Sequence, residues 1–394
     1  MCLDKICIKV WKRSKHMSTT YKKRVSQILE GTGITLNGSE PWDIHVSDER
    51  FYPRVLSDGS IGLGESYMDG WWECDRIDEA VSRLLRYDIP SRLKINPALV
   101  WSVVSAKLTN RQSEKRAFHI GQVHYDIGND LYQTMLDKRM TYTCGYWKSA
   151  EEPNRAITLD EAQEAKLDLV CRKIGLKAGQ RVLDIGCGWG SFAKFAAERY
   201  GAEVVGVTVS KEQQKLGKEL CSGLPVEIRL QDYRDVNESF DHVVSLGMIE
   251  HVGCKNYRTM YQVVDRCMKD DGLFLLHTIG GNKSAHTTDP WIEKYIFPNS
   301  MLPSVKQLAA AAERIFVMED WHNFGTDYDR TLMEWDRNFE THWDSLKDRY
   351  DERFRRMWRY YLLACAGSFR SRENQLWQIV YSKKGVLGGY VAVR

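Results

Sequence analysis

The sequence predicts an α/β protein in which a doubly wound parallel sheet follows a smaller, mainly helical N-terminal domain. Two observations lead to this prediction. From about residue 120, short apolar segments alternate with amphipathic helical segments, an order typical of parallel strands joined by crossover helices. Residues 1–108 lack this alternation and combine short helical patterns with turns. A chain of 394 residues is long enough for two such domains.

We place the N-terminal domain at residues 1–108, a basic and polar linker at residues 109–126, and the α/β domain at residues 127–394. Helical patterns in the first domain cover residues 22–30 and 77–86. This domain shows no set of residues typical of catalysis. We therefore expect the chemistry to lie in the α/β domain.

Seven segments of the α/β domain have the length and apolar composition of buried strands. They are residues 181–186, 204–209, 226–232, 240–247, 272–280, 316–324 and 375–384. Two long helical stretches precede the last of them. Thr158 and Glu161 form a capping box at the start of the helix before the first strand. Ser304 and Gln307 form a second capping box, and Ser210 caps a third helix.

The first strand leads into a glycine-rich loop at residues 184–190, Asp-Ile-Gly-Cys-Gly-Trp-Gly. Gly186, Gly188 and Gly190 allow the backbone to turn sharply and to approach a ligand closely. The helix that follows offers unpaired N–H groups and a positive dipole end to an anion. The spacing is GxGxG rather than the GxGxxG of dinucleotide-binding loops. With Asp184 leading, the loop resembles the donor-binding motif of S-adenosylmethionine-dependent methyltransferases.

Further donor contacts are expected where the second and third strands end. In nucleotide-binding α/β folds, an acidic residue after the second strand holds the ribose hydroxyls. This chain instead has Thr208, Ser210 and Gln213 there, and Gln213 could serve only as a helix-cap partner. After the third strand, Asp232 could accept a hydrogen bond from the adenine amino group, with Tyr233 beside it.

Motifs spread along the chain, from about residue 25 to residue 382, carry a more specific resemblance. They read, in order, GLGESYMDGWWECD, HYDIGNDLYQTMLD, TYTCGYW, VLDIGCGWG, GVTVSKEQ, GMIEHVG, LLHTIG, DPWIEKYIFPN and WHNFGTDYDRTLMEW. Together they resemble the cyclopropane-fatty-acyl-phospholipid synthases of the mycolic acid cyclopropane synthase family. The resemblance implies a class I S-adenosylmethionine-dependent methyltransferase fold, which is Rossmann-like with a seven-stranded doubly wound sheet.

The resemblance also implies an activity. A methylene group would pass from S-adenosyl-L-methionine to the cis double bond of an unsaturated phospholipid acyl chain, which becomes a cyclopropane ring. In this family a bound bicarbonate deprotonates the intermediate carbocation. The residues that match the bicarbonate ligands are Cys144 and Ile279, through backbone N–H groups, and Glu250, His277 and Tyr328, through side chains.

Donor contacts are implied in the same way. They are Tyr142, Thr143, the loop 184–190, residues 208–213, Asp232 and Tyr233. An alkene is a weak nucleophile, so the reaction must pass through cationic species. An aromatic face stabilises a desolvated cation by up to about 2 kcal/mol, and Tyr142, Tyr146, Trp147 and Tyr328 are available. Water must be excluded because it would quench the cation to an alcohol.

Several alternatives stay open from the sequence. Glu250 could itself be the base, with no bound anion. Next to it, His251 is interpreted as a structural hydrogen-bonding residue. Cys144 could be a nucleophile, although cysteines usually pack as small buried hydrophobes. The alternative functions are a fatty-acyl methyltransferase that leaves a methyl branch, an enzyme that uses mycolate-type chains, and an inactive donor- or lipid-binding protein. The joint presence of Glu250, His277 and Tyr328 argues against the inactive protein.

The composition of the chain indicates which classes of partner and which cellular compartment to expect. The net charge of +3 indicates no nucleic-acid partner. Ten cysteines without a CxxC pair predict neither a metal site nor a disulfide framework and indicate a reducing cytosol. The sequence shows no secretory signal and no apolar run of the ~18 residues that a membrane span needs. We therefore expect a cytoplasmic enzyme.

A substrate inside a bilayer requires peripheral contact, and the resemblance implies contact with the inner face of the cytoplasmic membrane. Residues 347–372 interleave arginines with aromatic side chains, which suits docking on anionic lipid. The arginines near the aromatic residues are Arg349, Arg353, Arg355, Arg356 and Arg359. The alternative is a helix with a solvated basic face. Residues 98–108 are a second candidate, and the resemblance implies that the N-terminal domain also supports a homodimer.

Overall fold

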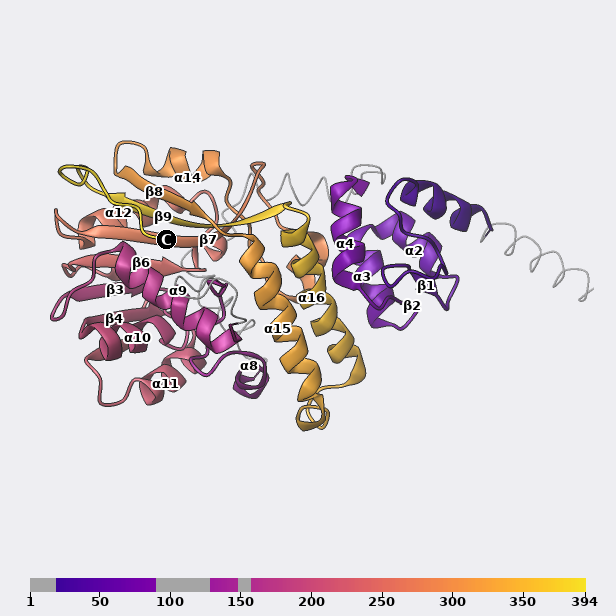
Figure 1. Cartoon of the computed structure of the whole chain (residues 1–394), viewed down its shortest axis with the longest axis horizontal. Coiled ribbons are helices and arrows are strands. Elements are labelled where there is room, and N and C mark those ends of the chain that lie inside the picture. The colour runs from indigo at the N-terminus through magenta and orange to yellow at the C-terminus, as the bar shows by residue number, and fades with distance from the viewer. Residues whose placement is uncertain (1–18, 90–127, 148–156) are drawn as a thin grey trace, which may run out of the picture.

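The computed structural model describes residues 19–89, 128–147 and 157–394. The predicted linker at 109–126 and the candidate membrane segment at 98–108 lie outside these residues. Figure 1 shows a helical N-terminal region and an α/β region, with two long helices between them. The domain boundaries proposed from the sequence stay a prediction.

The α/β region contains a seven-stranded sheet with the order β5-β4-β3-β6-β7-β9-β8 (Figure 1). Its strands are β3 (Arg181–Ile185), β4 (Glu203–Thr208), β5 (Val226–Leu230), β6 (His242–Leu246), β7 (Leu273–Gly281), β8 (Val317–Asn323) and β9 (Asn374–Ser382). The strands from β5 to β7 pair in parallel, as a doubly wound sheet requires. All seven predicted strand segments are confirmed.

The sheet is not parallel throughout, so the prediction of an all-parallel sheet is wrong for β9. This strand pairs antiparallel with both β7 and β8. Two helices, α15 (Thr326–Thr341) and α16 (Glu352–Arg370), connect β8 to β9 and pack against each other. A single helix would bring the chain back to the end of the sheet where β8 begins, so that the next strand would run parallel to β8. A pair of packed helices instead returns the chain to the end of the sheet where β8 ends. β9 must therefore run back between its neighbours.

Helices pack on both faces of this sheet. α9 (Leu159–Lys173) and α10 (Ser191–Tyr200) share one hydrophobic core with its strands, and α12 (Tyr257–Cys267) and α14 (Val305–Ala312) share another. The region also contains α8 (Asn129–Met135), α11 (Lys211–Leu220) and α13 (Pro290–Tyr295). Adjacent residues of β6, Val243 and Val244, point to opposite faces and belong to two separate hydrophobic cores. The three predicted caps are confirmed, because Thr158, Ser210 and Ser304 each accept a hydrogen bond from the third residue of their helix.

The N-terminal region is mainly helical, as predicted. Its elements are α2 (Phe51–Asp58), α3 (Ser60–Met68), α4 (Ile77–Arg86) and a ribbon of β1 (His45–Val46) and β2 (Trp72–Glu73). α4 coincides with the helix predicted at residues 77–86, and residues 19–29 form a helix where 22–30 was expected.

The N-terminal region packs against α16 of the α/β region. Arg356 of α16 donates hydrogen bonds to the carbonyl oxygens of Tyr67 and Trp72. Arg370, at the end of the same helix, forms an ion pair with Asp78 in α4. α3 and α4 are therefore held by specific contacts on a helix that also packs beside the sheet.

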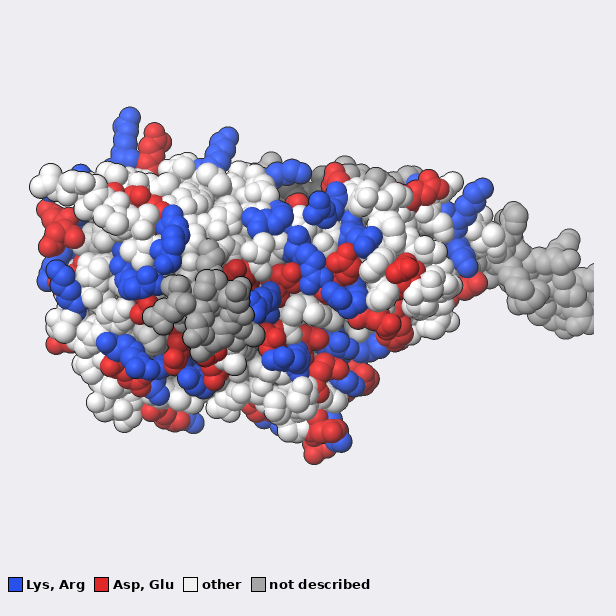
Figure 2. Space-filling view, viewed as in Figure 1, with Lys and Arg blue, Asp and Glu red and all other residues white. Residues whose placement is uncertain are grey.

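The arginines proposed as a membrane-docking patch all have acidic partners. The ion pairs are Arg349–Asp130, Arg353–Asp69, Arg355–Glu340, Arg356–Glu73 and Arg359–Asp336. Figure 2 shows Lys and Arg interspersed with Asp and Glu over this part of the surface. The contacts favour a helix face fixed by ion pairs over a free basic surface. Within the described ranges, no helix is both long and apolar enough to cross a membrane.

Candidate active site

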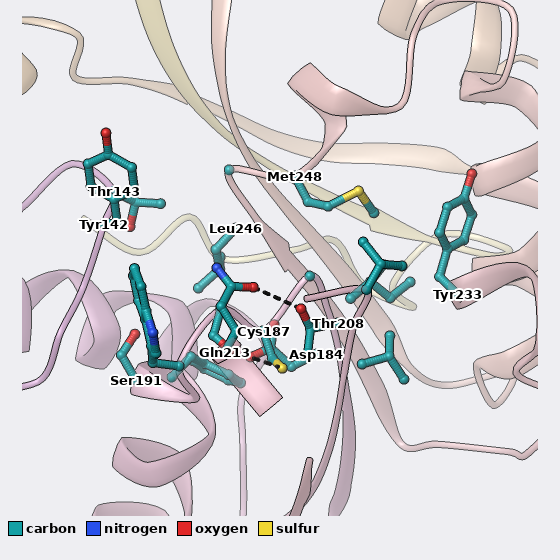
Figure 3. Close-up of a pocket in the computed structure, with 18 of the residues that line it drawn as sticks. Tyr142, Thr143, Asp184, Cys187, Ser191, Thr208, Gln213, Tyr233, Leu246 and Met248 are labelled. Carbon is teal, nitrogen blue, oxygen red and sulfur yellow. Dashed lines mark hydrogen bonds between the residues drawn. The ribbon is translucent and has the colours of Figure 1, made fainter. Parts of the chain in front are cut away.

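A cavity lies at the carboxyl ends of β3, β4 and β6, the edge where α/β sheets usually bind ligands (Figure 3). The predicted donor residues that line it are Tyr142, Thr143, Asp184, Gly186, Gly188, Thr208, Gln213, Asp232 and Tyr233. Figure 3 shows Tyr142 and Thr143 on one side of the cavity and Tyr233 on the opposite side. Gly190 and Ser210 do not line it but are the N-cap residues of α10 and α11.

The glycine loop forms one wall of this cavity. Gly186 and Gly188 have φ angles of +81° and +56°, which L side chains rarely adopt. A Cβ at Gly186 would lie 2.5 Å from Cγ of Met248, so the close turn requires glycine there. A Cβ at Gly188 would meet no atom within 4 Å and would take up space beside the cavity. The loop thus keeps a backbone cradle open.

The polar side chains that follow β4 and β5 are each held by a hydrogen bond to a residue nearby in the sequence. The Thr208 hydroxyl donates to Oε1 of Gln213 at 2.8 Å, and Ser210 accepts from the Gln213 N–H at 3.3 Å. Gln213 is therefore both a cap partner and a cavity residue, so the two interpretations of it are compatible. Both oxygens of Asp232 accept hydrogen bonds from Arg234. A carboxylate has about four lone-pair sites, so Asp232 keeps acceptor capacity for a ligand.

Glu250 follows β6, in the short 3-10 helix η2 (Ile249–His251). Its Oε1 accepts a hydrogen bond of 2.7 Å from the Ile279 N–H. Its Oε2 is buried and has no hydrogen-bond partner within the described residues. Burial raises the pKa of this carboxyl to about 7. The Ile279 N–H, which the resemblance assigns to bicarbonate, binds Glu250 in this structure.

His277 lies on β7 and is 1% exposed. Its Nδ1 is 3.4 Å from Nε2 of Gln378 on β9, and its own Nε2 has no partner in the described part of the chain. Burial lowers the pKa of the imidazole well below its usual value, and the nearby Lys166 and Lys173 add to this effect. His277 is therefore neutral at physiological pH.

Cys144 lies in the segment 144–147, which is bonded to the first turns of α15, the helix that also carries Tyr328. The Gly145 N–H donates to the Thr331 hydroxyl at 3.1 Å, which fixes this segment on the helix. Burial raises the pKa of the Cys144 thiol well above its usual value, so the structure does not favour a thiolate nucleophile. The Tyr328 ring stacks on Phe369 at 4.6 Å between centroids.

The five predicted bicarbonate residues lie next to the donor cavity rather than in its lining. Thr143 and His251 line the cavity, and they are the sequence neighbours of Cys144 and Glu250. The His277 ring lies 5.9 Å from the ring of Phe324. Phe324 directly precedes Gly325, the N-cap residue of α15. Of the five, Cys144 and Glu250 thus adjoin the cavity through their sequence neighbours, and Ile279 is bonded to Glu250.

Comparison with known proteins identifies the family. The family model described as mycolic acid cyclopropane synthetase matches residues 112–379. The chain belongs to this family. Cyclopropane-fatty-acyl-phospholipid synthase of Escherichia coli (strain K12) is 54% identical over 369 residues, which cover 94% of this chain and 95% of that protein. A probable fatty acid methyltransferase of Pseudomonas putida is 38% identical and covers 66% of this chain and 68% of its own length.

Solved structures of the family agree with the fold. The mycolic acid cyclopropane synthase CmaA1, complexed with SAH and CTAB, superposes with a TM-score of 0.62 at 30% identity, covering 68% of this chain and 98% of that chain. The predicted family and class I methyltransferase fold are confirmed. This member of the mycolic acid cyclopropane synthetase family is an S-adenosylmethionine-dependent methyltransferase.

The cavity of this family member fits the methyl donor. The backbone cradle at Gly188 would be filled by any side chain. Oδ1 of Asp184 is buried in the lining with no partner among the described residues, so it can accept a hydrogen bond from the donor. Burial raises the pKa of Asp184 to about 7, partly offset by Lys166. Within the described ranges, no group of three or more His, Cys, Asp or Glu side chains could hold a metal ion.

Sequence reasoning missed several residues that line the cavity, among them the titratable side chains of Lys166 and His251. Lys166 of α9 is completely buried and donates from Nζ to the Thr143 hydroxyl at 2.9 Å. Burial lowers the pKa of this ammonium to about 8. The signal was present, because Lys166 is four residues from the buried Ala162 on the apolar stripe of its helix. His251 was interpreted as structural, yet it lines the cavity, and burial lowers its pKa to about 4.

Proposed function

We propose that this protein transfers a methylene group from S-adenosyl-L-methionine to the cis double bond of an unsaturated phospholipid acyl chain. Similarity at 54% identity over almost the whole length of the Escherichia coli enzyme supports this substrate class. The observation that carries the chemistry is the pair of buried, unpartnered atoms beside the donor cavity, Glu250 Oε2 and His277 Nε2. A site that binds a small anion and accepts a proton needs such free, desolvated groups, here one acceptor and one ring nitrogen that can donate.

The reaction balances without a metal or a redox partner. The π electrons of the alkene attack the methyl carbon, the bond from that carbon to sulfur breaks, and S-adenosylhomocysteine leaves. The resulting carbocation then loses one proton from the transferred carbon. The electrons of that C–H bond close the cyclopropane ring, and one proton is released overall.

Bicarbonate would supply the oxygen that accepts this proton. Oε2 of Glu250 can take the proton that bicarbonate itself carries, because its raised pKa places it near neutral pH. Nε2 of His277 and the Tyr328 hydroxyl can donate to the anion and orient it. The Ile279 N–H would have to exchange its bond to Glu250 for one to the anion. If no anion binds, Glu250 itself is the base.

Aromatic rings adjoin both groups of residues. The Tyr142 ring lies 5.2 Å from Trp335, and Trp335 lies 6.0 Å from Tyr328. The Tyr142 hydroxyl is also hydrogen-bonded to that of Tyr361 at 2.8 Å. Such a wall excludes water and offers π faces to a cation, each worth up to about 2 kcal/mol when desolvated.

The partners form part of the same proposal. Acting on phospholipid chains, the protein would bind peripherally at the inner face of the cytoplasmic membrane, as a homodimer in the cytoplasm. The paired arginines of residues 347–372 are weak candidates for the docking surface. The N-terminal region remains the candidate for dimerisation and membrane contact.

Product analysis tests the proposal. The protein is incubated with labelled S-adenosylmethionine and vesicles of monounsaturated phospholipid, and the acyl chains are examined by mass spectrometry. We expect a gain of about 14 mass units and loss of the olefinic protons in NMR spectra, with no label in saturated vesicles. A gain of about 16 mass units would indicate a reduced methyl branch, the alternative suggested by the Pseudomonas putida relative. No labelled lipid at all would indicate a binding protein.

A further inference from the structure

Three polar side chains form a row across the antiparallel half of the sheet. His277 of β7 pairs in register with Gln378 of β9, and Gln378 pairs in register with His322 of β8. Residues directly opposite each other in antiparallel strands point to the same face. Gln378 therefore lies between two histidines on one face of the sheet, and it is completely buried.

Gln378 contacts the ring of His277 through a single hydrogen bond. Nε2 of Gln378 lies 3.4 Å from Nδ1 of His277, and an amide nitrogen is a donor only. In this orientation of the amide Nδ1 accepts, and Oε1 of Gln378 is buried without a partner among the described residues. A neutral imidazole carries one proton, so that proton sits on Nε2. Nε2 is the ring atom that has no partner in the described part of the chain.

Burial and the positive charges of two lysines favour the neutral form of the ring. Lys166 and Lys173 of α9 are both buried and both act on His277. Lys173 is also 3.1 Å from Nδ1 of His322 and pairs with Asp320. No carboxylate contacts Nδ1 of His277 among the described residues, so none competes with Gln378 for this nitrogen.

We propose that Gln378 is a positioning residue that fixes His277 in the tautomer with its proton on Nε2. Given the proposed function, this tautomer presents a hydrogen-bond donor to the bicarbonate oxygen. The opposite tautomer would present a lone pair to an anion and repel it. Gln378 would thus select the ligand of the site without touching it.

Two substitutions of Gln378 separate this role from packing. Gln378→Met keeps the volume but removes the donor, and Gln378→Glu replaces the donor by an acceptor. Histidine nitrogen shifts in protein labelled with 15N-histidine report the tautomer directly, with His277 assigned by its absence in His277→Gln. We expect the Nε2–H form in the unmodified protein, a mixture in Gln378→Met, and the Nδ1–H or doubly protonated form in Gln378→Glu. An Nδ1–H form in the unmodified protein, or no change in either variant, would overturn the proposal.

Activity provides the second readout. For metal-binding histidines, loss of the partner that orients the ring costs roughly ten- to a hundredfold. We expect a fall of similar size in kcat here, while KM for the donor stays unchanged. The control is Tyr381→Phe, which removes a buried hydrogen bond to Tyr261 from the same strand. An equal fall in Tyr381→Phe would assign the effect to strand packing and overturn the proposal. If the tautomer switches as expected but the unmodified enzyme is indifferent to bicarbonate, the tautomer assignment stands and the bicarbonate role fails.

Discussion

The donor cavity and the cluster around Glu250 and His277 differ in how their polar groups are paired. In the cavity, Thr208 and Gln213 bond to each other, and Asp184 Oδ1 is an exception that stays without a partner. In the cluster, Glu250 Oε2 and His277 Nε2 are both buried without partners in the described part of the chain. One region is held rigid by its own bonds, and the other keeps free bonding capacity.

This difference in hydrogen bonding suggests that the cavity binds the donor and that the cluster transfers the proton. Leaving a buried polar atom without a partner costs about 1–3 kcal/mol of stability, so a fold tolerates such atoms where a ligand or a proton will use them. Pairing in the cavity preorganises a surface for a bulky donor. Free atoms in the cluster suit a small anion or a mobile proton. Changes in the first region should therefore affect affinity, and changes in the second should affect turnover.

The largest expected effect is the loss of turnover when Glu250, one of two buried carboxylates, is replaced. Glu250→Gln should lower kcat by roughly 10²–10⁴-fold, the usual range for a general base, with the donor Kd unchanged by calorimetry. The matched variant Asp184→Asn, on the cavity side, should raise the donor Kd and lower kcat at saturating donor much less. If Glu250→Gln turned over normally, the role of Glu250 in proton removal would be wrong.

Bicarbonate depletion addresses the same cluster without a substitution. In CO₂-free buffer the initial rate should fall roughly tenfold or more, since the proton acceptor is lost, and added bicarbonate should restore it in a saturable way. Donor binding, measured in the same buffers, should not change. A rate that ignores bicarbonate would instead make Glu250 the base.

Two buried lysines on α9 test whether only residues of the cavity lining affect donor binding. Lys166 lines the cavity, whereas Lys173, seven residues further, pairs with Asp320 and lies near His322. Lys166→Met should weaken donor binding roughly tenfold, equivalent to about 1.4 kcal/mol. Lys173→Met should leave the donor Kd unchanged and lower the free energy of unfolding by about 1–3 kcal/mol. Equal effects on the Kd would mean that the cavity does not use Lys166.

The pH dependence of kcat at saturating donor should show one ionisation on the acidic side. Burial raises the pKa of Glu250 to about 7, and only the ionised carboxylate can accept a proton. The rate should therefore rise as the pH increases through about 7, and Glu250→Gln should abolish this rise. Asp184 also has a pKa of about 7, so the donor Kd is measured at each pH to separate its contribution. A flat profile near neutrality would contradict the assignment.

The two regions also differ in how well the sequence predicts them. The loop from Asp184 to Gly190 is contiguous, and its glycines encode its backbone directly, so its place at the end of β3 follows from the sequence. Cys144, Glu250 and His277 come from distant segments, and only the family resemblance brought them together. No local pattern links residues that meet through the packing of a sheet.

The direction and the register of β9 could not be predicted from the sequence, because both depend on tertiary contacts. The antiparallel direction of β9 depends on the pairing of α15 with α16, which is a tertiary contact. The contact between Gln378 and His277 depends on the register of β9. In a strand whose every residue is buried or nearly so, alternation does not reveal which side chain faces a site.

The smallest effect is expected at Arg355, on the helix whose arginines and aromatic residues predict membrane docking from the sequence. Its guanidinium already pairs with Glu340 and Glu352. A free arginine at an anionic membrane contributes about 1 kcal/mol, which corresponds to roughly a fivefold change in vesicle partitioning. Arg355→Gln should change partitioning on anionic vesicles by less than about twofold, as measured by sedimentation. Arg356 is a poorer choice, because it also holds the Tyr67 carbonyl. A fivefold loss in Arg355→Gln would restore this helix as a docking surface.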